Sequence, residues 1–195
     1  MKNVKKRLVF MTVAVIFLFS MAACGKESGS QDSGKETVEV KDSLEILTKV
    51  WESYSEENKF AITGGDYNNM TDNAPGKFDV TDKESLRSLL VVPEDGAELI
   101  DDGASMIHMM NANTFTGAAF HVKDAADVKT FEDSLKEAVL NNQWMCGFPE
   151  KLVLCQLGEQ YVVSAFGNGE MIEYFKTQLQ EQYPGVTVVA EESLV

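Results

Sequence analysis

Hydrophobic and polar residues follow three different patterns along the 195-residue chain. Residues 8–19 are apolar apart from Thr12, whereas residues 25–41 contain almost no apolar residue before Val38. From residue 42 onward, apolar positions recur at the two-residue spacing of strands or the three- and four-residue spacing of helices. The pattern predicts a signal segment (1–23), a tether (24–41) and a single folded domain (42–195).

The first 23 residues have the features of an export signal. Basic residues precede the apolar run and alanines end it (Lys2, Lys5, Lys6, Arg7, Ala22 and Ala23). The apolar stretch 8–23 has 16 residues, short of the roughly 20 that a membrane-spanning helix needs. We therefore expect an export signal and not a transmembrane anchor. The Gly- and Ser-rich residues that follow predict a flexible tether.

The first part of the folded domain predicts two helices separated by a turn-rich loop. Asp42 or Ser43 is expected to cap the first helix, whose apolar residues lie three and four positions apart (Leu44, Leu47, Val50, Trp51 and Tyr54). Turn-forming residues dominate residues 64–76, which predicts a loop that is the least ordered part of the domain. The predicted elements are a helix (43–58), a strand (60–63), the loop (64–76) and a helix (82–92) stopped at Pro93.

Two similar halves follow, at about residues 100–142 and 151–183. Each half predicts a β-hairpin and then an amphipathic helix with one apolar face (Val128, Phe131, Leu135 and Val139; Ile172, Phe175 and Leu179). The predicted strands are 105–110, 115–122, 151–157, 160–166 and 186–189, and the predicted helices are 124–142 and 168–182. The halves share an order of elements with little residue identity.

Helices with a single apolar face need an apolar sheet surface to cover. We therefore predict the α+β class, with a mainly antiparallel sheet of four to five strands and helices packed on one side. Nearly every residue of the strand 151–157 is apolar, which predicts a central strand covered on both faces. The N-terminal helix is the expected second cover.

The charge of the chain excludes one class of partner. There are 17 Lys and Arg residues against 31 Asp and Glu, and removal of the signal leaves 13 against 31, a net charge near −18. Such a surface repels phosphate backbones, so we expect no nucleic-acid partner. A cationic ligand, a metal ion or a basic cell-surface polymer stays open, as does the alternative that acidity only maintains solubility.

A candidate metal site lies in the first hairpin. In a strand, Met106, His108 and Met110 would share one face, and thioether and imidazole ligands together suit Cu(I). The alternative is that the methionines fill the core and His108 is satisfied by a hydrogen bond. For His121, a hydrogen bond to the start of the following helix is expected over a role as a base.

The remaining polar residues do not form a recognisable catalytic motif. Paired carboxylates are expected in solvated turns and tails (Asp66 with Asp72, Asp101 with Asp102, Glu191 with Glu192). An exported protein permits a disulfide, but the spacing of Cys146 and Cys155 leaves their pairing open. We therefore expect no cofactor and no enzymatic activity. The apolar loop 144–149, with Trp144 and Phe148, is the candidate contact surface.

Two stretches resemble known lipoproteins. The segment Met21-Ala22-Ala23-Cys24-Gly25 resembles the bacterial lipobox, with Met21 where leucine is usual, which implies that Cys24 carries a diacylglycerol. Residues 125–184 resemble a family of small Gram-positive lipoproteins of unknown function, including the Gly158-x-x-Tyr-Val-Val strand and an aromatic loop before Pro149. The resemblance implies a location and a fold, and assigns no catalytic residue.

The sequence as a whole predicts a membrane-tethered, extracytoplasmic lipoprotein that binds a partner and is not an enzyme. The lipid bilayer is contacted through Cys24, and the partner is expected to be an envelope protein or a wall polymer. The alternative function is copper binding, or a small envelope enzyme, based on the Met106, His108 and Met110 face.

Overall fold

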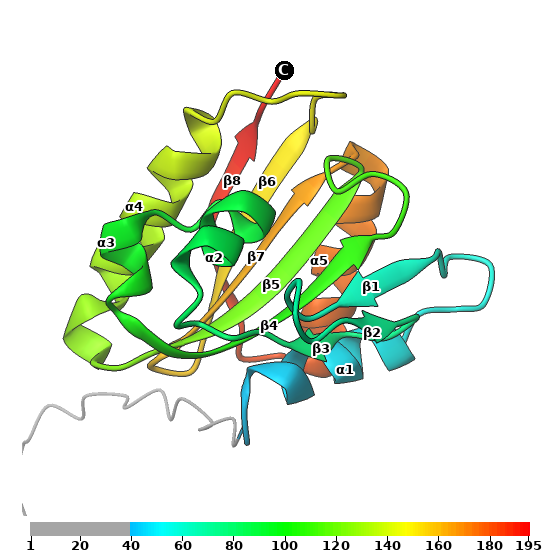
Figure 1. Cartoon of the computed structure of the whole chain (residues 1–195). Helices are drawn as coiled ribbons and strands as arrows, with labels where there is room; N and C mark the ends of the chain where they lie inside the picture. The colour runs from blue at the N-terminus through cyan, green and yellow to red at the C-terminus, as the bar shows by residue number, and fades with distance from the viewer. Residues whose placement is uncertain (1–39) are drawn as a thin grey trace, which may run out of the picture. The chain divides into compact units, whose positions relative to one another are not determined.

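The computed structural model describes residues 40–195 (Figure 1). The signal segment, Cys24 and nearly all of the tether lie outside these residues. The helices are α1 (Ser43–Glu52), α2 (Lys83–Leu90), α3 (Glu94–Ala97), the 3-10 helix η1 (Ala125–Asp127), α4 (Val128–Leu140) and α5 (Gly169–Gln182). The strands are β1 (Ile62–Gly64), β2 (Thr71–Asp72), β3 (Gly76–Lys77), β4 (Ile100–His108), β5 (Phe115–Val122), β6 (Lys151–Leu157), β7 (Tyr161–Gly167) and β8 (Thr187–Ser193).

All described strands join one antiparallel sheet. The order is β2-β1-β4-β5-β7-β6-β8, and β3 pairs with β4 beside this path. The α+β class is therefore confirmed, but the sheet has eight strands and the prediction of four to five is wrong. Two of the additional strands, β2 and β3, arise in the turn-rich residues 64–76, because short backbone segments there pair with β1 and β4.

Helices cover both faces of the sheet, so the prediction of helices on one side is wrong. Residues of α1 and α5 share one hydrophobic cluster with the sheet, and residues of α2, α3 and α4 share the other. Figure 1 shows α2, α3 and α4 in front of the sheet and α1 and α5 behind it. The physical reason is that nearly every residue of β5 and β7 is buried, so neither face of these strands is left to water.

The two hairpin-helix halves form in the predicted order, β4-β5-α4 and β6-β7-α5. β5 and β7 are neighbouring antiparallel strands. If a two-fold axis related the two hairpins, it would be perpendicular to the sheet. Such an axis would place α4 and α5 on the same face of the sheet. Instead, Phe131 of α4 and Phe175 of α5 belong to clusters on opposite faces. The halves therefore repeat an order of elements without being related by symmetry.

The strand β6 is buried on both faces, as its apolar sequence predicts. Leu152 and Leu154 pack toward α4, while Val153, Cys155 and Leu157 pack on the face of α5. The N-terminal helix α1 does not supply the second cover as expected, because it packs mainly over β4 and β5. Cys155 is buried in β6 and Cys146 is exposed in the preceding loop, and both are free thiols.

The helix starts agree with the capping residues expected from the sequence. Asp42 accepts a hydrogen bond from the N–H of Glu45, and Asp82 accepts one from the N–H of Ser85. The end of the first helix was misplaced, since α1 ends at Glu52 and not near residue 58. Its last predicted apolar residue, Tyr54, is nevertheless buried.

Candidate ligand-binding groove

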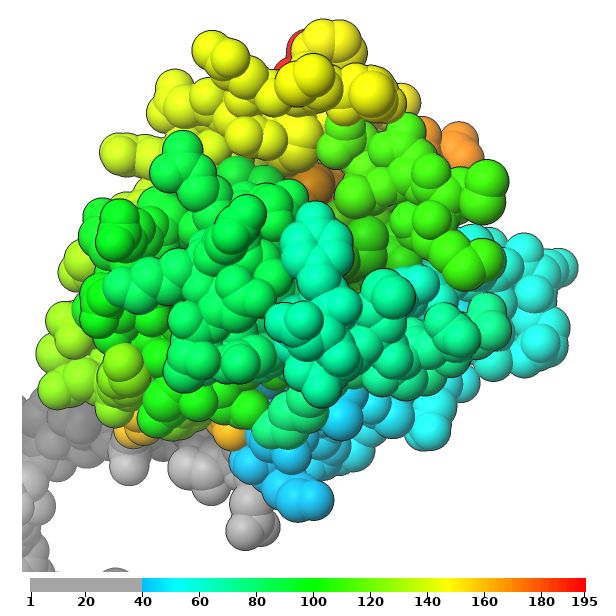
Figure 2. All heavy atoms as spheres, viewed as in Figure 1, coloured from blue at the N-terminus to red at the C-terminus, as the bar shows by residue number. Residues whose placement is uncertain are grey.

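A groove of about 600 Å³ opens at one end of the sheet. We call it the distal groove. It lies between α2, the β4–β5 turn (residues 109–114), the end of α4 and the α4–β6 loop (residues 141–150). Figure 2 shows this hollow between the green atoms of α2, the bright green atoms of the turn and the yellow atoms of the loop.

The inside of the distal groove combines an apolar floor with polar walls. Trp144 packs against Phe166 with ring centroids 5.2 Å apart, and both line the groove. The α2 side contributes Glu84, Arg87 and nearby Glu94. Amide side chains line the opposite side (Asn113, Asn141, Asn142 and Gln143). The arrangement can hold an apolar group on the floor while polar groups fix its orientation.

A second hollow of about 240 Å³ adjoins the distal groove, because Leu89 and Ala112 line both. Its other lining residues include Asp66 and His108. Hydrophobic side chains that are 54% to 81% exposed line the two hollows (Tyr67, Met70, Met109, Met110 and Met145). These are five of the nine large hydrophobic residues that are exposed within residues 40–195. Exposed hydrophobic side chains gathered in one place mark an interaction surface.

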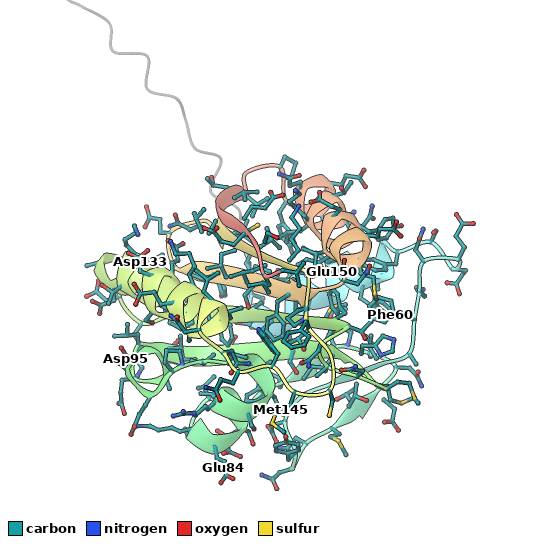
Figure 3. The ribbon with its side chains drawn as sticks, turned by 90° about the horizontal axis from the view of Figure 1, so that it is seen from above. Phe60, Glu84, Asp95, Asp133, Met145 and Glu150 are labelled. Carbon is teal, nitrogen blue, oxygen red and sulfur yellow. The ribbon has the colours of Figure 1, made fainter. Side chains whose placement is uncertain are left out.

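Two asparagines hold the α4–β6 loop against the β4–β5 turn. The side-chain amide of Asn111 donates to the carbonyl of Cys146 at 3.1 Å. The amide of Asn113 donates to the carbonyls of Met145 and Gly147 at 2.8 and 2.9 Å. These bonds fix the backbone of the loop and leave the side chain of Met145 at the border of the groove, across from α2 (Figure 3).

Backbone strain occurs at the same place. Three non-glycine residues in 40–195 have positive φ angles, and two of them border this region: Val91 at 57° and Cys146 at 64°. Val91 lines the distal groove, and Cys146 follows Met145. A β-branched residue in the left-handed region is unusual, and such strain persists only where the surrounding structure enforces it. Strained residues are concentrated at functional sites, which supports the groove as the site.

Buried Asp66 organises the segment that was expected to be the least ordered loop of the domain. Its carboxylate accepts hydrogen bonds from the backbone N–H groups of Asn68, Asn69 and Asp79 at 2.8 to 3.0 Å. Burial by itself raises the pKa of Asp66, but these hydrogen bonds outweigh it and hold the pKa below its ordinary value. The expectation that Asp66 is solvated is wrong, whereas Asp72 is exposed as expected.

The structure does not bring the predicted copper ligands onto one strand face. Met106 is fully buried, whereas Met110 lies beyond the end of β4 and is 81% exposed. His108 accepts hydrogen bonds at Nδ1 from the N–H groups of Met110 and Asn111. Because Nδ1 is occupied as an acceptor from the backbone, it is not free to bind a metal. Met106 and His108 lie two residues apart in β4, but Met110 lies beyond the strand, so the prediction that all three share one strand face is wrong.

The other predicted polar residues lie outside the groove. His121 contacts Asp101 at 2.6 Å, and Asp124 caps the following helix, so the expected role of His121 at that helix is wrong. Asp102 accepts a hydrogen bond from the N–H of Ser43 and pairs with Lys77.

The two C-terminal glutamates are part of a strand and not of a solvated tail. Glu191 lies in β8, where Lys151 and Lys176 hold its pKa at about 2. Glu192 lies in the same strand and is half-buried.

The candidate contact loop is part of the groove, though its two aromatic residues differ. Trp144 lies in the floor, and Phe148 is 70% exposed at the outside of the loop. Sequence reasoning missed the α2 side, with Arg87, and the asparagines of the turn. Asn111 and Asn113 lie between the predicted strands 105–110 and 115–122, and nothing local indicates that their amides hold a loop more than thirty residues later.

Within residues 40–195, no helix is both long and apolar enough to cross a membrane. In the same part of the chain, no three or more His, Cys, Asp or Glu side chains are grouped as metal ligands. Comparisons of the chain with family models, with curated proteins and with solved structures give no match. The resemblance of residues 125–184 to small lipoproteins and the lipidation of Cys24 therefore stay predictions.

Proposed function

We propose that this protein is an extracytoplasmic lipoprotein, held on the cell membrane through Cys24, that binds an envelope component in the distal groove without catalysing a reaction. The observation that carries the proposal is the gathering of exposed hydrophobic side chains around the groove. Burial of a side chain such as Met145 or Met110 under a ligand is favourable, because it removes apolar surface from water. The groove walls supply amides and charged groups that orient such a ligand.

The position of the groove supports a tethered mode of action. The described chain begins beside the start of β4, where Ser43 donates its N–H to Asp102 at 2.8 Å. The groove lies at the other end of β4, since Ala112 and Asn113 of the β4–β5 turn line it. At the rise of a β-strand, Asp102 and His108 are about 20 Å apart. The groove therefore lies at the end of the domain opposite to the side from which the expected tether enters.

Replacement of Cys24 by alanine tests the tether. We expect Cys24→Ala to release the protein into the medium or to leave an uncut precursor, because the acyl chains that hold it on the bilayer are lost. Membrane and soluble fractions are compared by immunoblot, and mass spectrometry of the native N-terminal peptide detects the lipid. An unmodified Cys24 sulfur, or unchanged partitioning into a detergent phase, contradicts lipidation.

Site-specific photo-cross-linking on intact cells tests the groove. A photoreactive residue at Met145 should capture an envelope component, because Met145 borders the groove and is 79% exposed. The matched control is Val189 on β8, which is 39% exposed and does not line the groove. Capture at both positions to the same extent, or at neither, overturns the assignment of the site.

A further inference from the structure

We propose that the occupant of the distal groove is an extended polypeptide segment that carries apolar side chains and a net positive charge. The inference rests on the proposed function of the groove and adds the chemistry of the ligand. Three properties of the site carry it: the type of hydrophobic side chain at its rim, the distribution of charge along its walls, and its open shape.

The hydrophobic rim is dominated by methionine. Met70, Met109, Met110 and Met145 surround the two hollows, each more than half exposed. Methionine is unbranched and polarisable, and grooves that accept apolar side chains of several shapes use it for that reason. A rigid small molecule would instead be matched by an enclosed pocket with few flexible side chains. The rim is therefore suited to the varied side chains of a polypeptide.

The charges of the groove favour a cationic ligand. Among the lining residues, the carboxylates of Glu84 and Glu94 outnumber the guanidinium of Arg87. The carboxylate of Glu94 is 4.0 Å from the ammonium group of Lys83, which lies outside the groove. The C-terminal end of α4 borders the same groove, since Asn141 and Asn142 line it, and helix C-termini carry partial negative charge. The chain as a whole has 31 acidic residues against 17 basic ones. A ligand with lysine or arginine beside its apolar side chains complements this field.

The shape and the polar walls suit an extended backbone. The two hollows are adjacent, with Leu89 and Ala112 lining both, and they are open to solvent on the face shown in Figure 2. Asn142 and Gln143 are exposed amides on the wall, each with both donor and acceptor groups. Such side chains can pair with the N–H and C=O groups of a bound main chain. An anionic lipid surface is disfavoured by the same acidic walls.

Peptide binding by the full-length protein tests the inference directly. The protein is reconstituted in phosphatidylcholine nanodiscs, and two short synthetic peptides are titrated by fluorescence anisotropy: one of leucine and lysine, and a matched one of leucine and glutamate. We expect the lysine peptide to bind at least about tenfold more tightly than the glutamate peptide, and its affinity to fall at high salt as the charges are screened. Empty nanodiscs correct for peptide bound to lipid. Equal binding of both peptides, or binding of neither, overturns the proposal.

Variants distinguish groove binding from general attraction to an acidic protein. The double variant Met110→Gln/Met145→Gln should weaken lysine-peptide binding about tenfold, because it removes apolar contacts without changing charge. The matched change Val189→Gln, away from the groove, should have no effect. Arg87→Ala should leave the affinity unchanged or increase it, since the guanidinium opposes a cationic ligand. Weaker binding by Arg87→Ala would contradict the charge argument, because removal of the guanidinium should not weaken the binding of a cationic peptide. Equal effects of the methionine and Val189 variants would show that the peptide binds elsewhere.

The outcome is separable from that of the proposed function. If the lysine peptide does not bind while Met145 captures a wall polymer on intact cells, the polypeptide ligand is wrong and the binding groove stands. If neither occurs, the groove itself is not the site.

Discussion

The two ends of strand β4 are built differently. Where the described chain begins, polar groups are paired with one another: Asp102 with Lys77 and the N–H of Ser43, and Asp101 with His121. At the opposite end, Met109 and Met110 are exposed, as is Met145 of the neighbouring loop. Exposed hydrophobic surface costs free energy in water, and the strained residues beside the groove add to that cost. Interactions within the chain pair the polar groups at the first end of β4, whereas the hydrophobic side chains at the second end are exposed and available to a ligand.

The largest expected effect on stability is the difference between replacing the buried Phe175 and replacing the exposed Phe148. Phe175→Ala should destabilise the domain by about 3–5 kcal/mol, because Phe175 is fully buried under the sheet and its removal leaves a cavity. Phe148→Ala, at a 70% exposed position beside the groove, should change stability by less than about 0.5 kcal/mol. Chemical denaturation of both variants measures the contrast. Native stability in the Phe175 variant would mean that the face of α5 is misassigned.

The next effect concerns the scaffold of the smaller hollow. Asp66→Ala should cost about 1–3 kcal/mol, because three backbone N–H groups lose their acceptor. Asp72→Ala is the matched control, since Asp72 is exposed, and it should be nearly neutral. Thermal unfolding of the two variants at neutral pH compares them. Equal melting temperatures would show that Asp66 does not hold this segment.

A smaller effect, of the opposite sign, is expected at the strained loop. Cys146→Gly should stabilise the domain by about 0.5–1 kcal/mol, because glycine adopts a φ of 64° without steric cost while the exposed thiol contributes little packing. Chemical denaturation under reducing conditions measures the change. Gly158→Ala is the reciprocal control, since Gly158 also has a positive φ of 62° with open space around it, and it should destabilise. Destabilisation by Cys146→Gly would contradict the assignment of strain.

The smallest effect lies on the surface of the sheet. The ion pairs of Glu191 with Lys151 and Lys176 lower its pKa from 4.5 to about 2 in the folded protein. Because the pKa is lower in the folded state, the stabilisation that these ion pairs give to the fold is complete above pH 4.5 and is lost as the pH falls toward 2. Because the side chain is 36% exposed, Glu191→Gln should cost less than about 1 kcal/mol at neutral pH.

Unfolding of Glu191→Gln and wild type is compared at neutral pH and near pH 2, with Glu192→Gln as the control. The difference between Glu191→Gln and wild type should shrink in acid. A difference that does not depend on pH would show that the ion pairs do not stabilise the fold.

Local signals predicted much of the fold. Asp42 caps the first helix as expected, and the helices predicted to start at residues 82 and 168 begin directly after their caps Asp82 and Asn168, because capping depends on residues within one turn. Phe131 and Phe175 are buried as the helical spacing predicts. The count of strands was wrong because β2 and β3 are held by pairing with β1 and β4, and no composition rule for a turn-rich segment reports such pairing.

The site was predicted only in part. The loop of Trp144 and Phe148 was recognised because apolar residues are unusual in a loop. Its partners were not, since α2 and the β4–β5 turn come far earlier in the chain and contact the loop only after the sheet has assembled. The prediction that Met106, His108 and Met110 share one face was wrong because β4 ends at His108. There, the Nδ1 atom of His108 accepts a hydrogen bond from the N–H of Met110 in the turn.

The sequence by itself determined the α+β class, the helix starts, the apolar helix faces and the burial of β6 on both faces, because these depend on local spacing and on which side chains avoid water. The expected central position of β6 is wrong, since only β8 separates it from the edge of the described sheet. Only the tertiary structure decided that the helices divide between two faces and that three distant segments enclose a methionine-rimmed groove. Periodicity identifies which residues are buried, but it does not encode the face on which each helix packs. That choice is made by connections and contacts between residues far apart in the chain.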